Sequence, residues 1–176
     1  NDNIIGDISN IPCIIYEKRE HVSSYLGVRH IAGLLKWEAF AQAAYTADVI
    51  EQELNKGLSI ADAIKQVQKV VGDRSDKLRK QYITYKLFLE ARDNLKFDVR
   101  PIINSFSLLT VAYNSASIRE YLGVEAYSKV SLDNELITSE KLDEFKNILT
   151  WIYGNTETSA QPVYTDPRVI TNTLSH

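Results

Sequence analysis

The chain has 176 residues, of which 44% are hydrophobic and 24% charged, so it can bury a core and is not a disordered tail. Only 7 Gly and 4 Pro are present, which argues against an all-β sandwich, because such a fold needs many turns. The single Cys excludes an internal disulfide and a multi-cysteine zinc site. No apolar run is long enough to cross a bilayer and no signal peptide is present, so we expect a cytoplasmic protein without a membrane partner. The sequence contains no Met, which predicts a fragment or a processed chain.

The charge is unevenly distributed. The net charge is −3, which by itself argues against a nucleic-acid-binding protein. Residues 65–86, however, carry seven cations and two carboxylates, a local charge of +5, so the rest of the chain sums to −8. One compact basic segment therefore lies within an acidic chain.

The pattern along the chain predicts a mainly α-helical fold. Residues 11–17 form a short β-branched run that we expect to be one strand, the end of a domain occupying 1–18 and continuing before residue 1. Cys13 lies in this run and should be buried and inert. A helical segment is predicted over 19–98 and a C-terminal helical subdomain over 99–176.

Helix signals follow in order. We predict helices at 20–31 and 36–55, then one capped by Ser59 and Gly72, then one from Ser75 or Asp76 to about Asn94. Pro101 breaks the chain, and shorter helices are predicted at 104–113, 115–122, 139–153 and 167–174, with a flexible loop at 155–162.

Residues 57–92 have the layout of a helix-turn-helix. Gly72 supplies the sharp turn between the two helices, and the second helix is predicted to bury one stripe, made of Leu78, Tyr82, Tyr85 and Leu89. On a helical projection with Lys77 at zero, this stripe covers about 80° to 140° and an adjoining basic and amide-bearing face covers about −60° to 60°. Arg79 lies apart from both, at about 200°. The face next to the stripe could enter a DNA major groove, with cations on phosphates and Gln81 or Thr84 on base edges. The predicted DNA-binding residues are Arg74, Ser75, Lys77, Arg79, Lys80, Gln81 and Thr84, with Arg79 the weaker candidate.

Several short segments in both halves of the chain carry a family resemblance. The first half contributes Arg29-His30-Ile31-Ala32-Gly33, Trp37, Phe40-Ala41-Gln42-Ala43 and Gly57-Leu58-Ser59, which opens the helix-turn-helix. The second half contributes Phe106-Ser107-Leu108-Leu109, Ile118-Arg119-Glu120-Tyr121-Leu122-Gly123, Trp151-Ile152-Tyr153-Gly154 and Asp166-Pro167-Arg168. In this order the segments resemble bacterial ParB-like proteins, in the part that follows the core of their N-terminal ParB/sulfiredoxin-type domain. The resemblance implies binding of double-stranded DNA in a partition, plasmid, phage or defence role.

Partition ParB proteins hold CTP with an Asn- and Arg-containing signature and a Gly- and Arg-rich loop. The counterpart at 29–33 lacks the family's Glu-Asn pair and its Arg in register, and the loop would lie before residue 1. We therefore expect no cofactor here. If a preceding domain supplied a phosphate site, Arg29 and His30 could contact the nucleotide.

No metal site or catalytic residue is predicted, because the three histidines are scattered and no nucleophile or phosphate-loop motif is present. We expect a DNA-binding homodimer, since such motifs commonly double their footprint by dimerisation. Two alternatives remain open: a nucleotide-dependent switch or enzyme whose active site lies mostly in a preceding domain, and a protein–protein interaction module.

Overall fold

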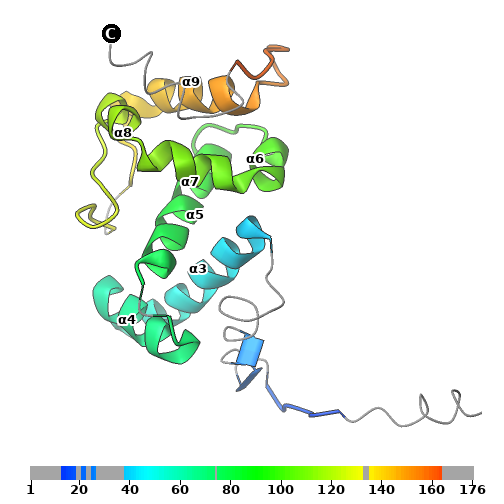
Figure 1. Ribbon diagram of the computed structural model, residues 1–176, viewed down its shortest axis with the longest axis vertical. Coiled ribbons are helices and arrows are strands. Elements are labelled where there is room, and N and C mark those ends of the chain that lie inside the picture. The colour runs from blue at the N-terminus through cyan, green and yellow to red at the C-terminus, as the bar shows by residue number, and fades with distance from the viewer. Residues whose placement is uncertain are drawn as a thin grey trace, which may run out of the picture.

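The computed structural model describes residues 13–18, 21–22, 25–26, 38–73, 75–132 and 135–163, and the fold within these ranges is mainly α-helical (Figure 1). The elements are α3 (Ala39–Asn55), α4 (Ile60–Val71), α5 (Lys77–Asp93), α6 (Arg100–Asn104), α7 (Phe106–Asn114), α8 (Ala116–Leu122), the 3-10 helix η2 (Ser139–Lys141) and α9 (Leu142–Tyr153). Among the described residues, no helix is long and apolar enough to cross a membrane.

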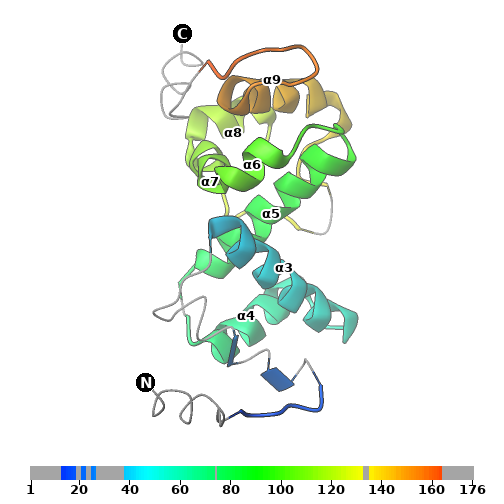
Figure 2. The ribbon, with the colours of Figure 1, turned by 90° about the vertical axis from the view of Figure 1, so that its right-hand side faces the viewer.

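Helix α5 is the central element of the fold. It packs mainly against α3 and also contacts α4 and α7. The two views show α4 toward one end of the molecule and α9 toward the other (Figures 1 and 2). A single hydrophobic core connects these parts and runs from Ala43 on α3 to Tyr153 on α9. The predicted segments on either side of residue 98 therefore share one core.

The apolar surface of α5 is wider than the predicted stripe. Leu78 and Tyr82 are buried as predicted, and Tyr85 and Leu89 are partly buried. The additional buried side chains on this helix are Ile83, Thr84, Leu87, Phe88, Glu90 and Ala91. Because these residues lie on both sides of the predicted stripe, the helix is enclosed by its neighbours along most of its length.

The predicted caps of α4 are confirmed. Ser59 is in extended conformation, and its hydroxyl accepts a hydrogen bond from the Asp62 amide at 3.2 Å. At the other end Gly72 has φ 75°, a left-handed conformation that glycine adopts without a steric penalty. Ala63, Ile64, Val67 and Val71 form the packed face of this helix, while Val70 is 38% exposed.

Replacing Ser59 by Ala should lower the free energy of unfolding by about 1 kcal/mol, because the Asp62 amide loses its acceptor. Ser59→Thr keeps a hydroxyl that can accept from the Asp62 amide and donate to its carboxylate, so it serves as the control. Urea unfolding followed by circular dichroism measures both variants. Equal stability of Ser59→Ala and the wild type would contradict the capping role.

The second half of the chain follows the predicted helices closely, with α7, α8 and the combined η2–α9 segment at 106–114, 116–122 and 139–153. Pro101 does not interrupt the helical structure, because it occupies the first turn of α6, where its missing N–H needs no partner. The helix predicted at 167–174 lies outside the described residues, as does most of that predicted at 20–31.

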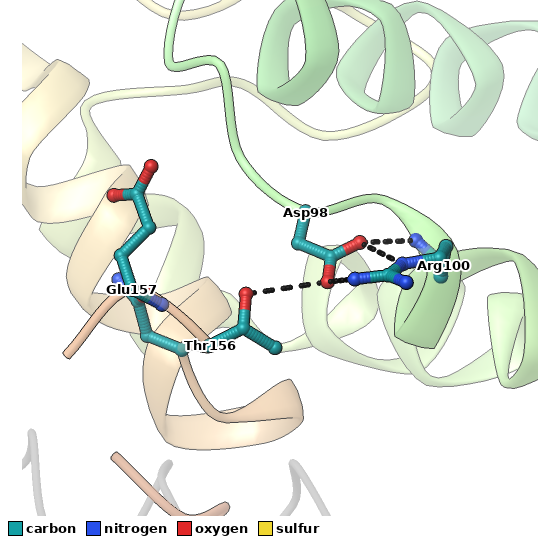
Figure 3. Close-up of polar contacts among 5 residues, drawn as sticks. Asp98, Arg100, Thr156 and Glu157 are labelled. Carbon is teal, nitrogen blue, oxygen red and sulfur yellow. Dashed lines mark hydrogen bonds and ion pairs between the residues drawn. The ribbon is translucent and has the colours of Figure 1, made fainter. Parts of the chain in front are cut away.

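The predicted loop after α9 begins as a tight turn, in which Asn155 pairs with Ala160. Thr156 on this turn donates to Asp98 at 3.3 Å, and Asp98 also accepts from the backbone and guanidinium of Arg100 (Figure 3). The Arg100 hydrogen bond holds the pKa of the Asp98 carboxyl below its usual range. Gly154 precedes the turn with φ 77°, and a Cβ there would lie 2.7 Å from the Ala160 carbonyl oxygen.

Two predictions about the N-terminal segment are wrong for the residues that the structure describes. Residues 13–17 have no strand conformation, and Cys13 is exposed rather than buried. Ile14 and Ile15 are 81% and 91% exposed. The physical reason is that a strand forms only when a neighbouring strand takes up its backbone hydrogen bonds, and within the described residues there is none.

Candidate nucleic-acid interface

The turn between α4 and α5 is held by a set of local hydrogen bonds. Asp73 accepts from the backbone amide of Ser75 at 2.8 Å and from its hydroxyl at 2.6 Å. The Gln68 side chain donates to the Ser75 carbonyl at 2.9 Å, which ties the turn back to α4. Because these bonds order the turn, the start of α5 has a defined direction relative to α4. Arg74 also belongs to this turn by sequence but lies outside the described residues.

Three lysines surround the α4–α5 turn. Lys69 is exposed in the last turn of α4, Lys77 is half-buried at the first position of α5, and Lys80 is exposed one turn further on. Lys80 lies 5.8 Å from the centre of the Tyr127 ring, a cation–π contact, and forms no ion pair with a carboxylate among the described residues. We call the surface of Lys69, Ser75, Lys77 and Lys80 the basic corner.

The side chain of Arg79 is hydrogen-bonded within the protein. Its Nε donates to the Tyr127 carbonyl, and its Nη2 donates to the Val130 carbonyl at 2.8 Å. These carbonyls belong to the irregular segment between α8 and η2. Arg79 therefore holds this segment against α5 and is not available for DNA, which corrects its place among the predicted DNA-binding residues.

Gln81 is also occupied within the fold. Its Nε2 donates to Gln42 on α3 at 3.1 Å, and its Oε1 accepts from the Thr46 hydroxyl at 3.1 Å. Thr46 is completely buried and Gln42 is 8% exposed, so the amide lies at the packed contact between α3 and α5. Both polar atoms of Gln81 therefore have partners inside the protein, which corrects the prediction that Gln81 reads a base edge.

Thr84 is completely buried, so the prediction that it reads a base edge is wrong. Its hydroxyl donates to the Lys80 carbonyl at 2.9 Å and lies 3.1 Å from the Tyr127 hydroxyl. Burial raises the pKa of Tyr127 to about 12, so this phenol stays neutral at physiological pH. The contact joins α5 to the segment that Arg79 also holds.

Sequence analysis missed the role of Glu90. The carboxylate is buried, with Oε1 accepting from the Leu136 amide at 2.7 Å and Oε2 from the Ile137 amide at 3.1 Å. Glu90 lies about three turns after Arg79 on nearly the same side of α5. Its place in the sequence among apolar residues such as Leu87 and Ala91 could have indicated this role, because a carboxylate in apolar surroundings needs hydrogen-bond donors.

The described residues contain no group of three or more His, Cys, Asp and Glu that could hold a metal ion. Arg29 and His30, named as possible nucleotide contacts, lie outside the described ranges. Comparison with protein-family models, curated proteins and solved structures found no match to this chain.

Proposed function

We propose that this chain binds double-stranded DNA through the basic corner, as a ParB-like helix-turn-helix protein. The observation that carries the proposal is the gathering of Lys69, Lys77 and Lys80 around an ordered helix–helix turn in a chain of net charge −3. Lysine ammonium groups neutralise phosphates, and the amino end of a long helix such as α5 adds a favourable dipole. Asp73 and Asp76 reduce the positive potential, so phosphate contacts must come mainly from the lysines.

The contacts of α5 also bear on the kind of DNA binding. Gln81 and Thr84, the two side chains suited to base edges, are engaged within the protein. Phosphate contacts position a protein on DNA without reading its sequence. We therefore propose binding with little sequence preference and a strong dependence on salt concentration.

A homodimer is part of the proposal, because two copies of a helix-turn-helix extend the contact over adjacent half-sites. A cytoplasmic location is proposed with it. Sedimentation velocity in the presence and absence of duplex DNA tests for the dimer. We propose no catalytic step for the described residues.

Replacing Lys77 and Lys80 by Glu should reduce affinity for random duplex DNA by at least about tenfold, because two phosphate contacts become repulsive. The measurement is fluorescence anisotropy at low salt, repeated over a salt series. The slope of log affinity against log salt is negative, and it should become less negative by about two when two phosphate contacts are lost. Circular dichroism should show unchanged helicity, since Lys80 is exposed and Lys77 is only half-buried, at the first position of α5.

The matched control is the pair Lys96→Glu and Lys146→Glu, which changes the net charge equally but lies beyond the carboxyl end of α5 and on α9. This control should keep DNA affinity within about twofold of the wild type, because its charges are remote from the basic corner. If the Lys77 and Lys80 variant also stays within about twofold, the proposed interface is wrong.

A further inference from the structure

A cleft of about 690 Å³ opens beside the basic corner. Its walls come from three parts of the chain: the start of α3, the first turns of α5 with the two residues before them, and the first half of α7. The volume lies within the range of about 300–1,000 Å³ that small-molecule sites occupy. The cleft is therefore large enough for a molecule of one or two rings.

The two sides of the cleft differ in chemistry. Phe106 and Val111 of α7 give it an apolar wall, while Lys77 and Lys80 of α5 give it a cationic wall next to the amino end of that helix. Asp76 also lines the cleft, so the two ammonium groups exceed the one carboxylate. A ligand that matches both walls has an apolar body and a negatively charged group.

The floor of the cleft is held rigid. Gln42 and Gln81 both line it, and the hydrogen bonds from Thr46 to Gln81 and from Gln81 to Gln42 join α3 to α5 beneath it. Because these amides are already paired, a ligand does not need to order them when it binds. Such preorganisation lowers the entropic cost of binding.

We propose that this cleft binds a small organic anion, with its ring system against Phe106 and Val111 and its anionic group against Lys77 and Lys80. A second part of the inference rests on the proposed DNA-binding function. Since Lys77 and Lys80 belong both to the cleft and to the basic corner, the bound anion and DNA compete for the same two charges. The ligand acts as an effector that releases the protein from DNA.

The probe is 8-anilinonaphthalene-1-sulfonate, a two-ring body with one sulfonate, and its uncharged relative N-phenyl-1-naphthylamine is the matched control. Both are titrated by fluorescence against a chain carrying Ile14→Ser and Ile15→Ser, because these exposed side chains offer another apolar surface. We expect the sulfonate to bind about tenfold more tightly than the uncharged probe, and Lys77→Ala with Lys80→Ala to remove that difference.

Ser107→Trp is the blocking variant. Ser107 lines the cleft and is exposed, so an indole can occupy the space without displacing core side chains. It should weaken binding of both probes, and DNA affinity in this variant should no longer respond to the sulfonate. Equal affinity for the two probes, or sulfonate binding that survives both sets of substitutions, would overturn the cleft assignment.

The probe titrations contain no DNA, so they test the cleft even if the DNA proposal fails. Adding the sulfonate to the protein–DNA complex tests the competition separately. A rise in the apparent dissociation constant for DNA supports the effector role. A specific sulfonate site with unchanged DNA affinity would retain the cleft and overturn the competition.

Discussion

Replacing Arg79 by Ala should lower the free energy of unfolding by about 3 kcal/mol, since hydrogen bonds to a charged group contribute about 1.5–3 kcal/mol and are not fully additive. The guanidinium donates to the Tyr127 and Val130 carbonyls, which lose their partners in the variant. Urea denaturation followed by far-ultraviolet circular dichroism measures the loss. Near-ultraviolet signals from buried Tyr127 should change at the same time.

Two controls separate the structural role of Arg79 from DNA binding. Lys80→Ala should change stability by no more than about 0.5 kcal/mol, because its side chain is at the surface. Arg79→Lys keeps the charge but loses the fork that reaches both carbonyls, so we expect an intermediate stability. An Arg79→Ala variant that is fully stable yet defective in DNA binding would show that the sequence prediction for this residue was correct.

Replacing Glu90 by Ala should have a comparable effect, a loss of about 2–4 kcal/mol, because each buried amide left without an acceptor costs about 1–3 kcal/mol. The amides concerned are those of Leu136 and Ile137. Glu90→Gln keeps one acceptor oxygen and should lose less. If the alanine variant were as stable as the wild type, the carboxylate would not be holding this segment.

The pH dependence gives a second measurement on the same residue. Burial raises the pKa of the Glu90 carboxyl above its usual value of 4.5, and the Leu136 and Ile137 amides oppose this only in part. Between the unfolded and the folded pKa, the Glu90 carboxyl is therefore protonated in the folded state and ionised in the unfolded chain. The stabilisation is complete below the unfolded pKa and is lost as the pH rises through the folded pKa.

Glu90→Gln removes this titration while leaving other carboxyls in place. The difference in unfolding free energy between wild type and Glu90→Gln should therefore be largest near about pH 4 and smaller near about pH 7. Denaturation of both chains over this pH series measures it. A difference that grows with pH would mean that the folded pKa is lowered and that the paired amides outweigh burial.

Local signals in the sequence predicted much of the fold. Ser59 and Gly72 fixed the two ends of α4 because a capping hydroxyl and a left-handed glycine act within a few residues. The second-half helices were placed within a few residues for the same reason. The strand predicted at 11–17 is absent from its described part, residues 13–17, because strand pairing depends on a partner distant in sequence, which no local pattern reports.

The candidate site was harder to predict, because the use of a polar side chain depends on what packs against its helix. Lys77 and Lys80 lie at the surface as the helical projection suggested. Gln81 and Thr84 fall on the same projected face, yet α3 and the segment containing Tyr127 cover them. The single predicted stripe on α5 did not indicate this coverage, because Ile83 and Leu87 are buried on a further side of the helix.

The bracing of the α8–η2 segment by α5 has a consequence for the modularity of this chain. A fragment ending after α5 would remove Phe106 from the Phe88 ring, the two carbonyl acceptors from Arg79 and the two amide donors from Glu90. The pair of helices α4 and α5 is therefore not expected to fold by itself when it is moved into another protein. A chimaera that takes the basic corner should therefore also take α7 and the segment through Ile137, which hold α5 from the other side.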